Sequence, residues 1–561
     1  MYQGGRALLL TCMTTLVQVP VPDVTGSAPA GRKTKLSLKE TLAEYKSSLP
    51  TRFGFAWRFA QRVPPLERGV NRYLINQGVN LLPPRPYGLS TKCDFTSHEA
   101  LVDKTYNSRQ LPPTVARLPR TTPDLDDVLA LFERKEFIPS DKSTVLFAYV
   151  AQWFTDGFLR SDRSVDKLER DITRNESTHE VDLAQLYGLT PEITKCLRDP
   201  DNPMLLASQG PIGAELPPDL FDANGTRVPR YADLRVIGVT KGHVDNGQLL
   251  AMGVDAGNTQ IGYAMLNTLF LREHNRIACE IAAATEGDAG WDDPDRIFAA
   301  ARSVLTVMLI KVVIEEYINH LHPYFFQFRL DPRGFDKQPW MRPNWVAVEF
   351  NLLYRWHSMI PSELDVGSER LTLEETFFRS KDLLTRHGLA RLVDSASRQP
   401  AGKIGLHNTD AWLLRFAERP SIQAGRTVRL RGYNEYRREC KIVPAKSFWD
   451  ISSNPDTVRM LSKIYSSVDD VEFFVGLFAE DTRPNSALPP LIGKLVGLHA
   501  FSQLMTNPLF APEVYNERTF SPRGLQIIDE TTSLAQVVQR NLPEGTPAPL
   551  VSLTQEGWRR Q

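Results

Sequence analysis

The fold is decided by the stretch EFNLLYRWHSMIP, which runs from Glu349 to Pro361. It places Tyr354 and His357 three residues apart, so on a helix an oxidisable phenol and an imidazole able to ligate a metal share one face. Three apolar positions would bury that helix: Phe350, Leu353 and Trp356. Since Pro361 predicts its end, we expect a short buried helix that joins a metal ligand, such as that of a haem iron, to a radical site.

Composition describes an ordinary globular protein. The 561 residues exceed what a single core usually needs, yet no low-complexity linker divides the central part of the chain. Hydrophobic residues make up 42% and charged residues 24%, with a formal net charge of +0. This balance gives no reason to expect a nucleic-acid partner.

The cysteines indicate an intracellular protein with reduced thiols. There are five, widely scattered and without a CxxC pair: Cys12, Cys93, Cys196, Cys279 and Cys440. Residues 7–19 imitate a signal-peptide core, but only Arg6 precedes them and Pro20 follows, so secretion is the alternative that we keep. No run approaches the ~18 apolar residues of a spanning helix, so any membrane contact is expected at the surface.

We divide the chain into three parts. Residues 1–35 are expected to form a mobile leader, residues 36–83 a helical segment on a membrane surface, and residues 84–561 the catalytic domain. The run RFGFAWRFAQRV mixes aromatic residues with arginines, as interfacial helices do. The alternative is a helix packed on the main body with snorkelling arginines.

The body of the chain is predicted to be mainly α-helical. In STVLFAYVAQWFTDGFL, Gln152 and Asp156 lie four residues apart and would share a helix face. A carboxylate among apolar neighbours must meet solvent, pair with a cation such as Arg160, or serve function. Further helices are predicted over residues 264–285, 298–321, 467–480 and 489–506. His274 is expected to be a hydrogen-bonded core histidine.

These segments, taken in order, resemble the cyclooxygenase branch of the animal-type haem peroxidase superfamily, which includes prostaglandin endoperoxide synthases and fatty-acid dioxygenases. The runs that carry the resemblance include FIPSDKSTVLFAYVAQWFT, VDLAQLYG, LREHNRIACEI, IKVVIEEYI, EFNLLYRWHSMIP, RQPAGKIG, NEYRRE and TFSPRGLQIIDETTSL. They span about residues 50 to 540. The resemblance implies the large helical haem peroxidase fold, haem b as cofactor, and a homodimer.

The resemblance also implies roles for individual residues. His357 matches the proximal haem ligand, Tyr354 the tyrosine whose radical takes hydrogen from a fatty acid, and Gln152 the distal glutamine. Trp356 is expected to pack beside the radical, and Arg160 to contact the cofactor. Four residues would line the substrate channel: Tyr324, Gly78, Ala500 and Val496.

The chain departs from the family pattern at several of these positions. Asp156 replaces the distal histidine, so peroxidase activity is expected to be impaired unless Asp156 acts as the base. Phe474 replaces a tyrosine near the proximal histidine, which would remove a hydrogen bond to it. Gly78 replaces the arginine that binds the fatty-acid carboxylate, which leaves Arg72 or Arg85 as substitutes. Ala500 stands at the serine that aspirin acetylates.

The sequence therefore predicts a haem-dependent fatty-acid dioxygenase that uses fatty acid and O2 and forms a hydroperoxide. Two alternatives remain at this point: a haem peroxidase that oxidises small reductants, and a relative that has lost catalysis and keeps the fold for interaction.

Overall fold

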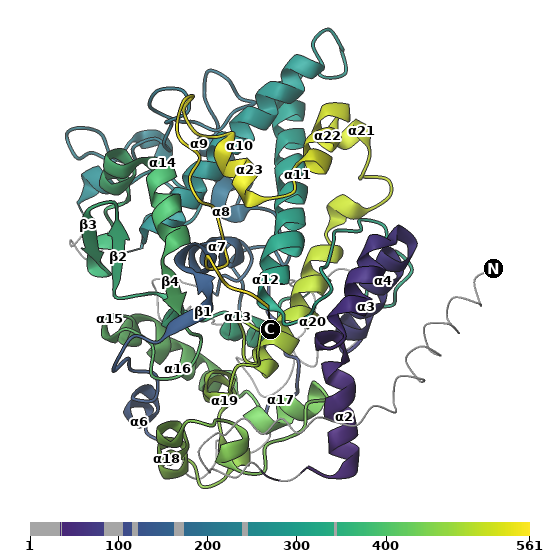
Figure 1. The fold of residues 1–561 in the computed structure, drawn as a ribbon. Helices are drawn as coiled ribbons and strands as arrows, with labels where there is room; N and C mark the ends of the chain where they lie inside the picture. The colour runs from purple at the N-terminus through teal and green to yellow at the C-terminus, as the bar shows by residue number, and fades with distance from the viewer. Residues whose placement is uncertain are drawn as a thin grey trace.

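The computed structural model describes residue 34 and residues 36–82, 105–114, 122–161, 173–237, 245–341 and 345–560. The described chain is mainly helical, as predicted, with long helices at the centre and short ones around them (Figure 1). Of the predicted leader, the structure describes Thr34, and Cys12, Cys93 and Arg85 lie outside the described residues.

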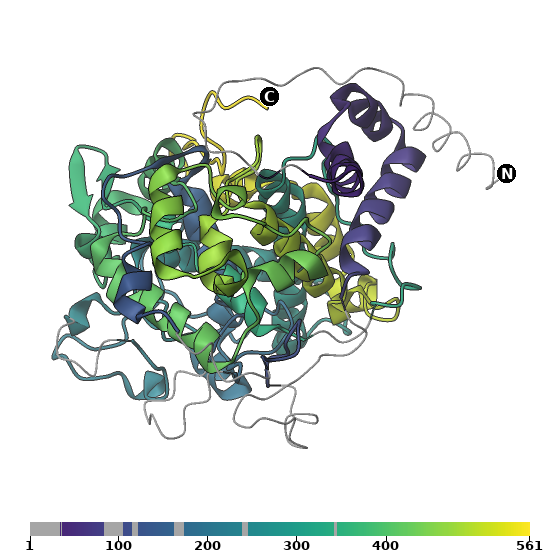
Figure 2. The same ribbon diagram turned by 90° about the horizontal axis from the view of Figure 1, so that it is seen from below.

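Three N-terminal helices form an arm along one side of the body (Figures 1 and 2). They are α2 (Leu38–Ser48), α3 (Gly54–Arg62) and α4 (Pro64–Val79), with the 3-10 turn η2 (Leu49–Thr51) after α2. Pro64 opens α4 because a proline at the first helical position loses no helical hydrogen bond. Helix α4 packs against α20 (Pro490–Met505), which joins the arm to the body.

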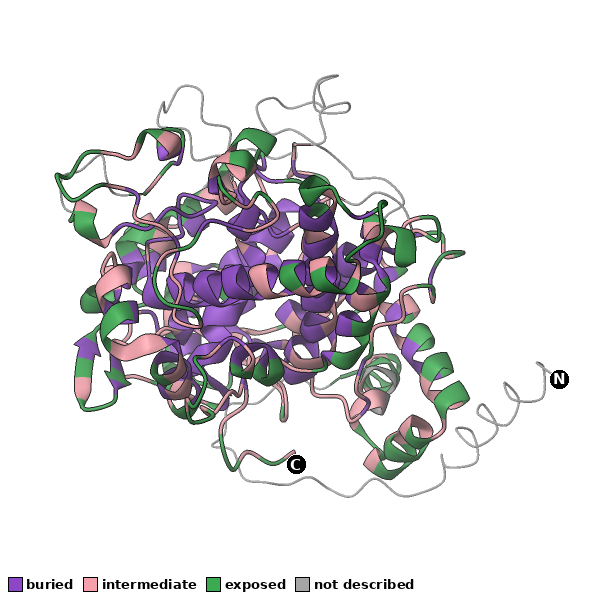
Figure 3. Ribbon diagram, turned by 90° about the horizontal axis from the view of Figure 1, so that it is seen from above, coloured by how far each residue is buried: buried purple, intermediate pink, exposed green. Residues whose placement is uncertain are grey.

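The core is built around helices whose inward-facing residues are buried (Figure 3). Helix α7 (Val145–Thr155) packs across α10 (Ile261–Ala284), and α10 packs along α11 (Pro294–Val312) and α14 (Ser380–Arg398). The first two confirm the helices predicted around Gln152 and over residues 264–285. His274, on α10, is confirmed as a core histidine, because its Nδ1 lies 2.8 Å from the hydroxyl of Tyr187.

Helix α11 continues through a π-helical turn, η6 (Val313–Ile318), into α12 (Asn319–Leu321). The combined helix Pro294–Leu321 is long and apolar enough to cross a membrane, which corrects the prediction that no segment reaches that length. However, 78% of its most apolar window is buried inside the protein, so it packs here as a core helix. Glu315 and Glu316 accept hydrogen bonds from separate backbone segments, at Leu330 and Leu534.

Two small antiparallel sheets complete the regular structure. Strand β1 (Pro139–Thr144) pairs with β4 (Pro400–Gly402), from Pro139 opposite Gly402 to Thr144 opposite Pro400, with a bulge between. Strand β2 (Glu363–Val366) forms a hairpin with β3 (Glu369–Thr372), with Val366 opposite Glu369. Gly367 in its turn has φ 65°, a conformation that favours glycine.

The other elements are short. They are α6 (Leu125–Leu129), α8 (Ala184–Tyr187), α9 (Pro191–Leu197), η3 (Pro229–Tyr231), η5 (Asn246–Gln248), α13 (Val348–Leu353), η7 (His357–Met359), η8 (Glu374–Thr376), α15 (Ala411–Leu413), η9 (Leu414–Glu418), α16 (Arg419–Thr427), α17 (Tyr433–Glu439), η10 (Phe448–Asp450), α18 (Pro455–Ile464), η11 (Val468–Asp470), α19 (Phe473–Ala479), η12 (Pro508–Phe510), α21 (Glu517–Phe520), α22 (Pro522–Glu530) and α23 (Leu534–Gln539).

The prediction of one helix through Tyr354 and His357 is wrong. Helix α13 ends at Leu353, Trp356 has a non-helical ψ of 47°, and a separate 3-10 turn, η7, begins at His357. Beyond the break, the Arg134 guanidinium donates to the carbonyls of Ser358, at 3.3 Å, and Ile360, at 2.7 Å. These carbonyls are therefore held by Arg134 rather than by a continuing helix.

Candidate functional site

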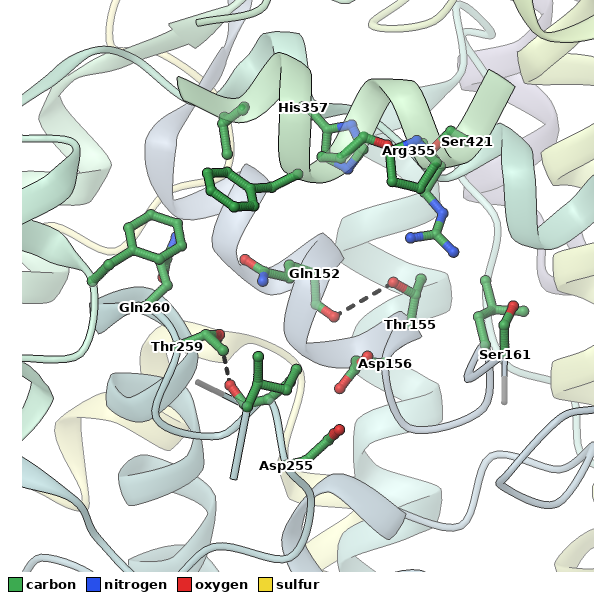
Figure 4. Close-up of a pocket in the computed structure, with 18 of the residues that line it drawn as sticks. Gln152, Thr155, Asp156, Ser161, Asp255, Thr259, Gln260, Arg355, His357 and Ser421 are labelled. Atoms are coloured by element: carbon green, nitrogen blue, oxygen red, sulfur yellow. Dashed lines mark hydrogen bonds between the residues drawn. The ribbon is translucent and has the colours of Figure 1, made fainter. Parts of the chain in front are cut away.

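One cavity of about 2480 Å³ is lined by five of the predicted site residues: Gln152, Asp156, Tyr354, Trp356 and His357. Its walls come from α7, α13, η7, α16 and the segment that precedes α10. In Figure 4, His357 and Arg355 lie on one side of this cavity, and Gln152 and Asp156 lie on the other. Such a volume exceeds the ~300–1,000 Å³ of a pocket for a small drug-sized ligand. The cavity can therefore hold a large cofactor together with part of a substrate.

His357 presents its ring to the cavity with Nδ1 turned away from it. Nδ1 is buried and has no hydrogen-bond partner, whereas the side chain as a whole is 20% exposed and lines the cavity. Glu418 Oε1 lies 3.2 Å from Nδ1, behind the ring. The orientation leaves Nε2 as the nitrogen that is able to ligate a metal in the cavity.

Glu418 is a site residue that the sequence did not reveal. It ends the π-helical turn η9, more than 60 residues from His357, and no local pattern connects the two. The resemblance predicted an imidazole without a polar partner because Phe474 lacks a hydroxyl. Phe474 does pack in the core, stacked on Phe132, but the carboxylate of Glu418 places a polar group beside the imidazole.

Tyr354 follows α13 and lines the same cavity. Trp356 packs against it with the two rings tilted and their centroids 4.7 Å apart, and also lines the cavity. Burial raises the pKa of the Tyr354 hydroxyl, and the neighbouring Tyr317 hydroxyl partly offsets that rise. Tyr354 is therefore a neutral phenol at physiological pH, so its oxidation to a neutral radical removes a proton as well as an electron.

Gln152 and Asp156 share one face of α7 and line the cavity, as the spacing predicted. Gln152 is the exposed residue in a helix whose other residues are buried, because its side chain faces the cavity. Asp156 Oδ2 accepts a hydrogen bond from Arg160 at 2.5 Å and another from the hydroxyl of Tyr263 at 2.9 Å. These contacts fix the carboxylate at the cavity wall.

Arg160 does not line the cavity, which corrects its prediction as a cofactor contact. It is fully buried and paired with Asp156, with Asp255 and, at 3.7 Å, with Glu176. Burial alone would lower its pKa, but the carboxylates of Asp156 and Asp255 outweigh burial and raise the pKa of Arg160. Arg160 therefore neutralises a cluster of carboxylates next to the cavity.

The residues present fit a haem. The cavity offers an imidazole opposite an amide, flat aromatic and aliphatic walls, and arginines able to meet the two propionate carboxylates. The arginines that line it are Arg227, Arg235, Arg355, Arg379 and Arg426. The Nδ1 atom of His357 is buried and has no hydrogen-bond partner. It is therefore available for the hydrogen bond that a metal-ligating histidine makes with its other ring nitrogen.

The four predicted channel residues lie outside the walls of this cavity. Val496 and Ala500 are buried on α20, and Gly78 lies on α4, which packs against α20. A Cβ atom added at Gly78 would meet no atom within 4 Å, so space surrounds this position. Tyr324 is half-buried and stacks on His322 at 4.9 Å. Their role as a channel stays a prediction.

The two arginines proposed as substitutes at Gly78 differ in outcome. Arg72 is ion-paired with Asp331 at 2.7 Å, and Arg85 lies outside the described residues. Arg560, which the sequence did not single out, donates to the carbonyl oxygen of Tyr324. It places a cation next to the predicted channel mouth.

Comparison with known proteins identifies the family. The sequence model of the animal haem peroxidases matches residues 133–551. This range is most of the chain and contains every cavity residue named above. The chain belongs to the animal haem peroxidase family. Haem binding follows from this membership and fits the arrangement of His357 and Gln152.

Curated relatives point to one branch of this family. The chain is 32% identical to prostaglandin G/H synthase 1 of Rattus norvegicus over 84% of its length and 76% of that protein. It is 28% identical to prostaglandin G/H synthase 2 of Equus caballus, over 89% of this chain and 80% of that protein. Both of these relatives are prostaglandin G/H synthases, and each matches more than 80% of this chain.

Solved structures confirm the haem peroxidase fold. The fatty acid alpha-dioxygenase of Arabidopsis thaliana matches with a TM-score of 0.65 at 16% identity and covers 91% of both chains. The alpha-dioxygenase of Oryza sativa, solved with palmitic acid, matches with a TM-score of 0.62 at 17% identity over 91% of this chain and 95% of that one. Peroxidase A from Dictyostelium discoideum also gives 0.62 at 19% identity, over 81% and 96%.

Proposed function

We propose that this animal haem peroxidase is a fatty-acid dioxygenase that uses haem b, with Tyr354 as its radical site and His357 as the iron ligand. One observation carries the proposal: Tyr354, Trp356 and His357 line the same cavity, with the ring of Trp356 packed against that of the tyrosine. The prostaglandin synthases among its relatives and the alpha-dioxygenases that share its fold support the choice of substrate class.

The chemistry balances around Tyr354. Bound haem supplies the one-electron oxidising power that starts the reaction. Loss of an electron and a proton leaves a neutral radical on the phenol oxygen of Tyr354, which then takes a hydrogen atom from a carbon of the fatty acid. O2 adds to the carbon radical, and the resulting peroxyl radical takes a hydrogen atom back from Tyr354. The product is a hydroperoxide, and the radical on Tyr354 is formed again.

Binding of the acyl chain does not require an arginine at position 78. A charge-assisted hydrogen bond is worth about 1.5–3 kcal/mol, and each buried methylene contributes about 0.8 kcal/mol. Two to four additional buried methylenes therefore offset the missing arginine, and Arg560 lies beside Tyr324 to meet a carboxylate. We propose a long-chain fatty acid as the substrate.

Oxygen consumption by the haem-reconstituted protein tests the assignment. A panel of saturated and unsaturated long-chain fatty acids, each started with a trace of hydroperoxide, should show uptake of one O2 per hydroperoxide formed, identified by mass spectrometry. The His357→Ala variant, which lacks the iron ligand, should show none. No uptake with any acid by protein that carries haem would contradict the proposal.

A second candidate is a peroxidase for small reductants, which the fold of Dictyostelium Peroxidase A supports. We propose that this activity is weak, because Asp156 already accepts hydrogen bonds from Arg160 and Tyr263 where a general base is needed. Guaiacol oxidation with hydrogen peroxide separates the two functions. A protein without catalysis, the third candidate, would show no Soret band after reconstitution with haemin.

We further propose that the N-terminal arm rests on a membrane surface. Phe55 and Phe59 lie one turn apart on α3 and are 68% and 64% exposed. Burying each phenylalanine in lipid contributes about 1.5–3 kcal/mol, so Phe55→Asp with Phe59→Asp should weaken binding to phosphatidylcholine vesicles at least about tenfold. The matched control is Ile212→Asp, which changes an exposed apolar residue on another part of the surface. Equal sedimentation of all three proteins with vesicles would contradict this placement.

Location and assembly are further proposals. The described cysteines, Cys196, Cys279 and Cys440, are all free thiols, which supports an intracellular, peripheral membrane protein. The resemblance to cyclooxygenases supports a homodimer. Cell fractionation and light scattering of the purified protein test the two proposals separately.

A further inference from the structure

Glu418 is a buried carboxylate whose partners do not account for its burial. Its side chain is 2% exposed, and the Thr409 hydroxyl donates to Oε1 at 2.9 Å. Oε2 is buried without a hydrogen-bond partner. Among the described residues, the basic group within 4 Å of this carboxylate is the His357 ring. Burying a carboxylate is costly unless a donor or a cation pairs with it.

His357 likewise has a buried polar atom that lacks a hydrogen-bond partner. Its Nδ1 is also buried and has no hydrogen-bond partner, although it lies 3.2 Å from Glu418 Oε1. Two buried polar groups, one able to donate and one able to accept, thus face each other and are not yet aligned. An imidazole aligned with Oε1 would satisfy both groups, and a metal bound at Nε2 would hold the ring in that orientation.

We propose that Glu418 is the positioning residue for the proximal histidine: it accepts the Nδ1 hydrogen of His357 and so makes the imidazole a stronger electron donor to haem iron. This inference rests on haem binding and on no property of the fatty acid. A carboxylate that accepts this hydrogen increases the electron density on the imidazole more than a neutral acceptor does, and hydrogen bonds to ionised groups are the stronger ones.

The position of the Glu418 carboxylate matters because the opposite wall of the cavity has no histidine among the described residues. Asp156 stands where the family has a distal histidine, and its Oδ2 is held by Arg160 and Tyr263. His357 is then the residue through which the protein can change the reactivity of the iron. Electron donation from that ligand stabilises ferric over ferrous iron and favours cleavage of an O–O bond. Glu418 thereby compensates for the altered distal wall.

The test is a spectroelectrochemical titration of haem-loaded protein without fatty acid. Glu418→Gln keeps the shape and removes the charge, so at a fixed potential the ratio of ferrous to ferric haem should rise at least tenfold, which is about 59 mV for one electron. Resonance Raman of the ferrous protein should show a lower iron–histidine stretching frequency. Glu418→Asp, which retains a carboxylate, should give values between those of the wild type and Glu418→Gln.

The matched control is Glu349→Gln, which changes another buried glutamate whose partners are the Tyr436 hydroxyl and the backbone of Gln110. It should leave both the potential and the stretching frequency unchanged. A haem-loaded Glu418→Gln protein with wild-type values would overturn the inference, as would a Glu349→Gln shift of equal size. Because the readouts are properties of the haem, failure of fatty-acid oxygenation leaves this test intact.

Discussion

Replacement of Tyr354 by phenylalanine should lower fatty-acid-dependent oxygen uptake by at least about 100-fold, which is ~2.7 kcal/mol in the barrier. The ring, and with it the contact with Trp356, stays in place, and the hydroxyl proposed to form the radical is lost. The Soret band should be unchanged, because His357 and Gln152 are untouched. Oxygen electrode traces and the haem spectrum of the same sample give the two measurements.

The control for this variant is Tyr149→Phe. Tyr149 is another buried phenol, on α7, and burial likewise raises its pKa. It does not belong to the described residues that line the cavity, so loss of its hydroxyl should leave oxygen uptake at the wild-type level. Retention of uptake by Tyr354→Phe would rule out Tyr354 as the radical site.

Replacement of Arg160 by methionine should destabilise the protein by roughly 3–5 kcal/mol, the usual cost of removing one partner from a buried ion pair. It leaves the carboxylates of Asp156 and Asp255 without the cation that pairs with both. Urea unfolding followed by circular dichroism measures the loss.

Arg235→Met is the matched control for the loss of Arg160. Arg235 also pairs with a member of the cluster, Glu176 at 3.2 Å, but its side chain is 54% exposed. Exposed ion pairs contribute about 0–1 kcal/mol, so this variant should unfold close to the wild-type urea concentration. Equal losses in the two variants would show that burial of Arg160 does not matter.

The sequence predicted the helical framework well where the hydrophobic pattern is local. Apolar residues at helical spacing predicted α7, α10 and α20. It failed at Trp356, where the same kind of pattern continues but the chain leaves the helix. Beyond that point the carbonyls of Ser358 and Ile360 accept hydrogen bonds from Arg134, more than 200 residues away in the sequence, a contact that no local pattern predicts.

The candidate site likewise contains residues that could be predicted from the sequence and residues that could not. Tyr354, His357, Gln152 and Asp156 belong to two short motifs and could be predicted from spacing and resemblance. Glu418 could not, because its contact with His357 depends on how a remote helix is placed. The ion pair of Asp156 with Arg160 follows from their four-residue spacing, but Asp255 joins them only in the folded protein.

The side chains that neighbour Tyr354 and His357 on the side away from the cavity both come from π-helical turns. Tyr317, next to Tyr354, belongs to η6, and Glu418, next to His357, belongs to η9. A π turn holds one residue more than an α turn, and one residue corresponds to a rotation of about 100° around the helix axis. Deleting a single residue from either turn would preserve the helix and aim Tyr317 or Glu418 elsewhere. The helical phase at these two turns thus sets which side chains the tyrosine and the histidine meet.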